Sequence, residues 1–179
     1  MEIAPIGVDE IERLEPLWQL VHSQHQAVAP NDGPYVDAET TWRVRREVYR
    51  ECLSGEGFAL IATEGGADVA YALVAITSDQ AVWADTWIVG ARVAELESLA
   101  VVPEARGRGI GTLLLDDVDA ELTRRGIGDM VIGAVAQNTE AIRLYERRGF
   151  RVSWTVLTRF ASRSESAAPA PFGSDSERA

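Results

Sequence analysis

The feature that most constrains this chain is the glycine-rich segment Arg106–Gly111, which has the sequence RGRGIG. It lies between a predicted strand, residues 95–102, and a predicted apolar helix that begins at Ile110. Glycine adopts backbone conformations that other residues avoid, and it lets a ligand approach the backbone closely. Because the N–H groups at a helix N-terminus attract anions and the two arginines add charged donors, we predict a cradle for phosphate or pyrophosphate here.

Two better-known phosphate-binding loops fit this segment poorly. A Walker A loop needs a lysine before its Ser or Thr, and all 17 basic residues of this chain are arginine. The dinucleotide fingerprint needs a third glycine, whereas Thr112 and Leu113 stand at the positions where it would fall. That fingerprint also opens a βαβ unit, whereas two predicted helices precede most of the strands of this chain.

The order of the predicted elements indicates a mixed α/β, or α+β, domain. A short strand over residues 2–6 is followed by a helix that either kinks at Pro16 or begins there. The later elements are a helix over 37–53, a hairpin over 58–77, a strand over 95–102, a helix over 110–122, a strand over 130–135, a helix over 138–148 and a final strand over 150–160. Residues 161–179 are rich in Ser, Ala and Pro, so we expect a domain over 1–160 and a disordered tail over 161–179.

The charge of the chain is acidic and unevenly distributed. The formal net charge is −11; residues 1–103 hold 6 Arg and 17 acidic residues, whereas residues 104–159 hold 9 Arg and 8 acidic residues. Such a chain is unsuited to non-specific binding of nucleic acid or anionic membranes. No apolar run reaches the roughly 18–20 residues that span a bilayer, and the first residues lack the pattern of a signal peptide. With Cys52 as the only cysteine, we expect no intrachain disulfide and a cytoplasmic protein.

Two segments together resemble the motifs of the GCN5-related N-acetyltransferases, the GNAT superfamily. Residues 99–111 resemble motif A, whose core R/Q-x-x-G-x-G/A is matched by Arg106, Gly109 and Gly111. Residues 138–150 resemble motif B, N-x-x-A-x-x-x-Y-x-x-x-G-F. The resemblance covers residues 1–160 and implies the fold of that family: a mixed, mostly antiparallel sheet of about seven strands, with a V-shaped splay between the two central strands and about four flanking helices.

The resemblance also implies acetyl-CoA as the co-substrate. Its pantetheine arm would pair with the backbone of Leu99 and Val101, and the side chain of Asn138 would contact the cofactor. Its pyrophosphate would bind the amides of Arg106, Gly107, Arg108, Gly109, Ile110, Gly111 and Thr112. Tyr145 would protonate the leaving thiolate as the general acid. Asn138 and Tyr145 are seven residues apart, which places them on one face of a helix with Ala141 between them.

Simpler roles stay open for these residues. Asn138 can be a helix N-cap alone, and Tyr145 can be a packed aromatic residue alone. Arg147 and Arg148 are expected to complement the C-terminus of their helix.

The chemistry needs one further group, because a protonated amine cannot attack until a base or a chain of waters accepts its proton. Glu95 and Glu97 lie on the strand that leads into motif A, where members of the family often have a carboxylate base. They are two residues apart and so share one face of an extended strand, where each can raise the pKa of the other. We favour Glu97 as the base; the alternative is that both carboxylates are solvated.

Other residue types give weaker signals. Cys52 is predicted to be structural. His22 and His25 lie near a loop that lines the acceptor pocket in the family, but a helix-end or surface position is the favoured explanation for them, and without further ligands they do not indicate a metal. Four aromatic residues could contact an ammonium, pack in the core or, for the last two, form a dimer surface: Tyr35, Trp42, Trp83 and Trp87.

We therefore predict an acetyl-CoA-dependent N-acetyltransferase in which a primary amine attacks the thioester directly, without a metal. The acidic first part of the chain favours a small cationic amine as the acceptor. A protein N-terminus or lysine side chain is one alternative, and a non-catalytic sensor that binds acyl-CoA is another. The expected partners are acetyl-CoA and the amine, with no nucleic acid and no membrane, and the chain is expected to be a monomer or a homodimer.

Overall fold

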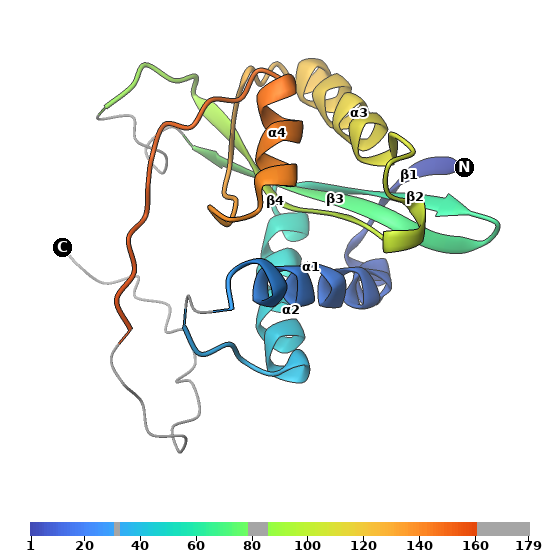
Figure 1. Ribbon diagram of the computed structural model, residues 1–179. Coiled ribbons are helices and arrows are strands. Elements are labelled where there is room, and N and C mark those ends of the chain that lie inside the picture. The colour runs from blue at the N-terminus through green and yellow to red at the C-terminus, as the bar shows by residue number, and fades with distance from the viewer. Residues whose placement is uncertain (31–32, 79–85, 161–179) are drawn as a thin grey trace.

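The computed structural model describes residues 1–30, 33–78 and 86–160. In this part of the chain one mixed sheet contains the strands β1 (Glu2–Ile6), β2 (Phe58–Glu64), β3 (Ala67–Ser78), β4 (Arg92–Val101) and β5 (Asp129–Ile132). They lie in the order β1-β2-β3-β4-β5, and all neighbours are antiparallel except β4 and β5, which are parallel. The expected mixed α/β fold is confirmed, with five described strands instead of about seven (Figure 1).

Two pairs of helices cover the two faces of the sheet (Figure 1). One face is covered by α1 (Glu15–Val28) and α2 (Ala38–Ser54), and the other by α3 (Ile110–Arg125) and α4 (Thr139–Arg147). Two short 3-10 helices, η1 (Val8–Leu14) and η3 (Pro103–Ala105), precede α1 and α3. Each face therefore has its own apolar core, with the sheet between the two cores.

Local signals in the sequence set the ends of these helices. Pro16 lies in the first turn of α1, so of the two possibilities for this proline the helix start is confirmed. The side chain of Asp37 accepts a hydrogen bond of 2.8 Å from the Thr40 amide at the start of α2, and this bond lowers the pKa of the carboxyl group. Gly126 ends α3 with a φ of 70°, a conformation that costs glycine little.

The prediction of a final strand over residues 150–160 is wrong. These residues form no strand in the described structure, and the side chains of Val152, Trp154, Val156 and Leu157 are all more than half exposed. Their alternation matches the pattern of a strand, but a strand also needs a neighbouring edge to pair with. The edge strand β5 has only 4 residues, and among the described residues it pairs with β4 alone. The predicted tail over 161–179 and Trp83 lie outside the described residues.

The strand β4 positions the candidate site. It pairs with β3 from Arg92 to Val101, but it pairs with β5 only from Val93 to Leu96. Beyond Leu96 the two strands part, so within the described sheet the second half of β4 has an edge that no strand covers. The family resemblance implies a V-shaped splay between the two central strands; in the described sheet the parting lies between β4 and the edge strand β5.

A β-bulge at Glu97 changes the direction of the side chains along β4. The register with β3 skips Glu97, so this residue has no partner directly opposite. Ala94 and Leu96 belong to the core under α3, whereas Ala100 belongs to the core under α1 and α2. The even-numbered side chains of β4 therefore point to one face of the sheet before the bulge and to the other face after it.

Three buried hydroxyl groups support the bulge from the side of α2. The Tyr49 hydroxyl lies 2.8 Å from that of Tyr71 and within hydrogen-bond distance of Ser98 Oγ, which donates to the carbonyl oxygen of Glu97 at 2.7 Å. Each hydroxyl has one proton, so the donation to Glu97 fixes the direction of the chain: Tyr71 donates to Tyr49, and Tyr49 donates to Ser98. Burial raises the pKa of Tyr49 and raises that of Tyr71 to about 12, so both phenols stay protonated.

Removal of the middle hydroxyl should destabilise the fold. Tyr49→Phe leaves the buried Tyr71 hydroxyl without its acceptor, which should lower the free energy of unfolding by about 1–3 kcal/mol. Urea denaturation measures this loss. Tyr35→Phe is the control, because the hydroxyl of that residue belongs to an exposed side chain. Equal losses in the two variants would show that the hydroxyl chain contributes nothing of its own.

Candidate active site

A cleft of about 670 Å³ opens where β4 parts from β5. Lining residues come from α1 and α2 on one face of the sheet and from the start of α3 and from α4 on the other, so the cleft connects the two faces. The predicted site residues in its lining are Glu95, Glu97, Leu99, Val101, Arg106, Gly107, Gly109, Ile110, Gly111, Thr112, Asn138 and Tyr145. The structure thus brings the two motifs and the two carboxylates into one space. Of the predicted set, Arg108 lies outside this lining.

The glycine-rich turn forms one end of the cleft. Gly107 and Gly109 have φ values of 72° and 80°, in the left-handed region that favours glycine. Gly109 is the N-cap of α3 and has no side chain that could accept hydrogen bonds from the N–H groups of the first helical turn. These N–H groups, at the positive end of the helix dipole, are the kind of donors that bind phosphate.

The two arginines of the turn have different partners. Arg106 lines the cleft, and its Nε donates to the carbonyl oxygen of Val101 at 3.1 Å. Arg108 donates hydrogen bonds of 2.9 and 2.6 Å to the carboxylate of Glu64, which lowers the pKa of Glu64. The guanidinium of Arg108 is therefore paired with Glu64 of β2, outside the cleft lining.

The helix α4 carries the predicted pair Asn138 and Tyr145. Asn138 Oδ1 accepts a hydrogen bond of 3.3 Å from the Ala141 amide, so this residue caps α4 and lines the cleft at the same time. Tyr145 is 9% exposed, and burial raises its pKa to about 12. Its ring packs edge-on against Phe150, with 5.9 Å between the ring centres. The Tyr145 phenol therefore keeps its proton at neutral pH, as a hydrogen-bond or proton donor must.

The two carboxylates of β4 have different surroundings. Glu97 accepts a hydrogen bond of 3.0 Å from Arg45 Nη1, and the Arg45 guanidinium lies 4.4 Å from the centre of the Trp18 ring. Burial raises the pKa of Glu95 above its usual value, the charge of Glu97 raises it further, and Arg45 offsets part of this rise. Across the described ranges, no hydrogen bond or ion pair engages the Glu95 side chain. Of the two carboxylates of β4, Glu95 is therefore the one that can accept a proton without first losing a partner.

Sequence reasoning missed several residues of the cleft lining, among them Trp18, Arg45 and Arg147. Trp18 and Arg45 lie far from both motifs, and no local pattern could have identified them, because they meet only when α1 packs against α2. Arg147 was expected to complement the C-terminus of its helix, and it also lines the cleft. Its neighbour Arg148 instead forms ion pairs with Asp116 and Asp119 of α3.

Two other candidate residues lie near this site. Cys52 on α2 is half-buried, and burial raises the pKa of its thiol to about 11, as suits a structural residue. His25 lines the cleft, with its ring edge-on to that of Trp18 at 6.5 Å. Burial, and then the charges of His22 and Arg45, lower the pKa of His25.

The remaining candidates pair with other parts of the protein. His22 Nε2 lies 2.9 Å from the Val36 carbonyl oxygen, and Trp42 Nε1 donates to Glu12 at 3.3 Å. Among the described residues, no group of three or more His, Cys, Asp or Glu is arranged to hold a metal ion. Within the same ranges, no helix has the length and apolar character needed to cross a membrane.

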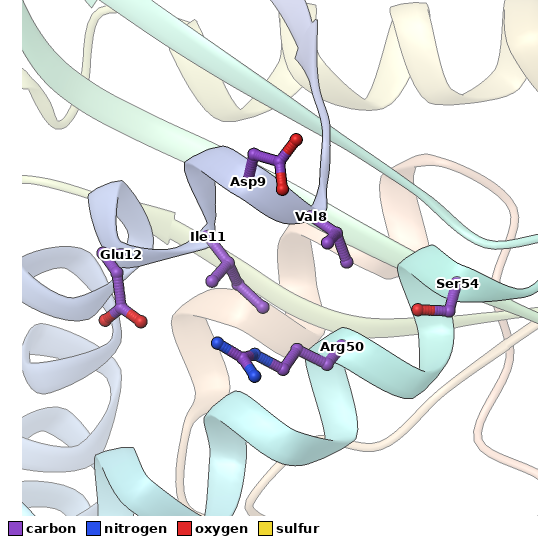
Figure 2. A pocket seen from close by; sticks show the side chains of 6 residues that line it. All are labelled: Val8, Asp9, Ile11, Glu12, Arg50 and Ser54. Atoms are coloured by element: carbon purple, nitrogen blue, oxygen red, sulfur yellow. The ribbon is translucent and has the colours of Figure 1, made fainter.

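A second hollow, of about 440 Å³, lies between η1 and α2 (Figure 2). Its lining consists of Val8, Asp9, Ile11 and Glu12 from η1 and of Arg50 and Ser54 from α2. Figure 2 shows the Arg50 side chain extending between α2 and η1, and Glu12 also interacts with Trp42 and Arg46. Because this hollow contains no glycine-rich turn and none of the predicted site residues, the candidate active site is the cleft at β4.

The sequence comparisons agree with this geometry. The model of the acetyltransferase (GNAT) family matches residues 15–150. The chain is 31% identical over 88 residues to the ribosomal protein bS18-alanine N-acetyltransferase of Escherichia coli K12, a match that covers 49% of this chain and 51% of that protein. It is 39% identical over 67 residues to the mycothiol acetyltransferase of Geodermatophilus obscurus, covering 35% of this chain and 22% of that protein. The chain thus spans about half, or less, of the length of these curated relatives.

Solved structures show the same fold. A putative acetyl transferase from Pyrococcus furiosus superimposes with a TM-score of 0.68 at 22% identity, covering 89% of this chain and 100% of that one. An aminoglycoside N-acetyltransferase in complex with CoA superimposes with a TM-score of 0.62 at 19% identity, covering 91% of this chain and 100% of that one. At these identities the likeness concerns the fold alone.

A negative charge in the glycine-rich turn should prevent anion binding. Gly109→Glu places a carboxylate at the N-terminus of α3 and a side chain at a φ of 80°, so the affinity for CoA should fall by about 100-fold or more. Isothermal titration calorimetry with CoA measures the change. Gly128→Glu is the control, because it adds the same charge where an added Cβ meets no atom within 4 Å and outside the cleft lining. Undiminished affinity in Gly109→Glu would refute the cradle.

Proposed function

This chain belongs to the acetyltransferase (GNAT) family, and from that premise we propose that it transfers an acetyl group from acetyl-CoA to a primary amine. The observation that carries the proposal is the cleft at β4, in which an anion-binding turn, an uncovered strand edge, a protonated phenol and a carboxylate without a partner meet. These groups suit an anionic thioester on one side and an amine on the other. We assign the activity to a domain over residues 1–160.

Acetyl-CoA would supply the acetyl group in activated form, as a thioester. The N–H groups from Arg106 to Thr112 would hold its pyrophosphate, and the side chains of Arg106 and Arg147 would add positive charge. Leu99 and Val101 would pair with its pantetheine arm along the edge of β4 that β5 leaves uncovered. Asn138 would contact the arm from the start of α4.

The chain's own residues would move the protons of the reaction. Glu95 accepts the proton that the ammonium must lose before its nitrogen can attack the thioester carbon. A C–N bond then forms and the C–S bond breaks, and Tyr145 donates its proton to the leaving sulfur. The nitrogen loses a second proton as the amide forms, and this proton restores the Tyr145 phenol through solvent.

The surroundings of the two carboxylates support Glu95 as the base in place of Glu97, which sequence reasoning favoured. Glu97 is held in an ion pair with Arg45, so protonation of Glu97 would break that pair. The raised pKa of Glu95 brings it closer to that of an amine, which makes the proton transfer less unfavourable.

We propose as the acceptor a small amine that is cationic before it loses its proton. The acidity of residues 1–103 supports this choice less than the sequence suggested, because of the 14 acidic residues that the structure describes in that range only Glu95 and Glu97 line the cleft. Others are paired elsewhere, such as Asp68 with Arg13 at 2.7 Å. Glu95 and Glu97 therefore carry the argument for a cation.

A protein N-terminus is the second candidate acceptor. The Escherichia coli relative that is 31% identical over 88 residues is named for acetylation of an alanine of a ribosomal protein. Such a substrate also presents one primary amine. Thiol release from acetyl-CoA with small amines and with peptides as acceptors separates the two candidates.

Removal of the Tyr145 hydroxyl should slow turnover without weakening cofactor binding. Tyr145→Phe keeps the ring, so kcat for thiol release should fall by about 100-fold or more while the Kd for acetyl-CoA stays within about twofold. Tyr35→Phe serves as the control. An unchanged kcat would remove Tyr145 from the mechanism. If acetyl-CoA binds but no amine or peptide releases thiol, the protein is a sensor and not an enzyme.

The pH dependence of kcat/KM should report the ionisation of Glu95. The carboxylate must be ionised to accept a proton, so activity is lost as the pH falls through its pKa, above the value of about 4.3 for a free glutamate. Glu97→Gln removes a neighbouring negative charge and should move this loss to lower pH. Glu95→Gln should lower kcat/KM by about 100-fold or more and abolish the acid limb.

The exposed residue Glu47 offers the matched control for this series. Glu47→Gln removes the same charge from the surface of α2 and should leave the profile unchanged. A wild-type profile in Glu95→Gln would show that another group is the base.

A further inference from the structure

The part of the cleft that would receive the amine carries a small net charge. Its lining comes from α1, α2 and the bulged part of β4, and we call it the acceptor end; its charged side chains are Arg45, Glu95 and Glu97. Burial, and then the charges of His22 and Arg45, lower the pKa of His25, so the imidazole of His25 is neutral at pH 7. Two carboxylates and one guanidinium give the acceptor end a net charge of −1.

The other charged lining residues belong to the opposite face of the sheet. Arg106 lies in the turn before α3, and Glu140 and Arg147 lie on α4. In the proposed function this side of the cleft faces the phosphates of the cofactor. The charged side chains beside the bound acceptor are therefore those of the acceptor end, Arg45, Glu95 and Glu97.

Arg45 is a fixed part of this end. Its guanidinium lies 4.4 Å from the centre of the Trp18 ring and 5.7 Å from that of Tyr49, and its Nη1 donates to Glu97 at 3.0 Å. The side chains of Arg45 and Glu97 are only 29% and 20% exposed, so solvent screens this pair less than a surface pair. Because an arginine stays protonated, it balances Glu97 at every working pH and leaves one negative charge, that of Glu95, for the ligand.

The wall beside these charges is largely apolar, although α1 also contributes the polar side chains of Gln24 and His25. Leu20 and Val21 of α1 line the cleft together with Trp18, and the first two are partly exposed. Apolar lining with few polar groups favours a ligand whose body is uncharged and partly apolar.

We propose that the acceptor carries one ammonium group on an otherwise uncharged, partly apolar body. The inference rests on the proposed function and names its substrate class. One ammonium brings the acceptor end from −1 to 0, whereas a second cationic group would leave an excess positive charge beside Arg45. A carboxylate close to the amine would leave an excess negative charge beside Glu95 and Glu97. An unbalanced charge in a partly buried site costs free energy, so a ligand that leaves such a charge binds more weakly. A free monoamine and the N-terminal residue of a peptide share this chemistry.

Three amino-acid α-amides test the charge rule, because they share one α-amine and differ in the side chain. Leucinamide carries one positive charge, argininamide carries two, and the α-amide of glutamic acid is neutral overall. Thiol release from saturating acetyl-CoA gives kcat/KM for each, and leucinamide should exceed the other two by about tenfold. An amidated tripeptide that begins with leucine distinguishes the sources: a higher kcat/KM than that of leucinamide assigns the site to peptides, and a lower one assigns it to free amines.

Two variants should change the preferred charge in opposite directions. Arg45→Gln makes the acceptor end −2, so argininamide should gain on leucinamide by about tenfold or more. Glu97→Gln makes it 0, so the α-amide of glutamic acid should gain by a similar factor. Arg46→Gln is the matched control, because this neighbour on α2 pairs with Glu12 outside the cleft lining. Calorimetry with acetyl-CoA confirms that each variant is folded.

The outcomes separate this inference from the proposed function. The charge rule is overturned if argininamide is the best acceptor of the unchanged protein. It is also overturned if Arg45→Gln does not alter the order of kcat/KM among the three amides. Neither result contradicts the proposed acetyltransferase activity. If the protein acetylates polyamines but none of the three amides, the charge rule is likewise overturned and the proposed activity is retained. A protein that binds acetyl-CoA and releases no thiol with any amine overturns the proposed function, and the charge rule with it.

Discussion

The site depends on the point at which β4 stops pairing with β5. Backbone N–H and C=O groups need partners when they are shielded from water, and β3 satisfies only one edge of β4. Beyond Leu96 no strand of the described sheet covers the other edge, which lies within a cleft that begins at the glycine-rich turn. A ligand with amide groups and phosphates can therefore complete the sheet at one end and bind a helix N-terminus at the other. The bulge at Glu97, supported by the Tyr71–Tyr49–Ser98 hydroxyl chain, lies beside this opening.

The opening also brings together groups from the two faces of the sheet. Tyr145 lies on α4, over the same face as α3, whereas Arg45 belongs to α2 on the opposite face. Glu95 lies between Ala94 and Leu96, whose side chains belong to the core under α3, so the side chain of Glu95 lies on the face of α1 and α2. In the proposed reaction the donor and the acceptor of protons therefore approach from opposite sides. An unbroken sheet would keep these groups apart, which is why the parting of two strands matters more than any single side chain.

Short-range patterns predicted the glycine-rich turn and the helix caps at this cleft, because both are local. The left-handed glycines and the N-cap role of Asn138 follow from neighbouring residues alone. The ion pair between Arg45 and Glu97 joins residues 52 positions apart, and it exists only because α2 packs beside β4. This contact is what separates the roles of the two carboxylates. The prediction of a final strand was wrong for the opposite reason: residues 150–160 have the alternating pattern of a strand, but the described sheet has no strand that pairs with them.

Amide hydrogen exchange, measured by mass spectrometry with and without CoA, tests the central claim most directly. If the parting of β4 from β5 is the cofactor site, CoA slows exchange in Arg106–Thr112 and in Leu99–Val101. Exchange in Val8–Glu12, which lines the second hollow, should stay the same. Slower exchange in Val8–Glu12 with no change in the glycine-rich turn would contradict the account.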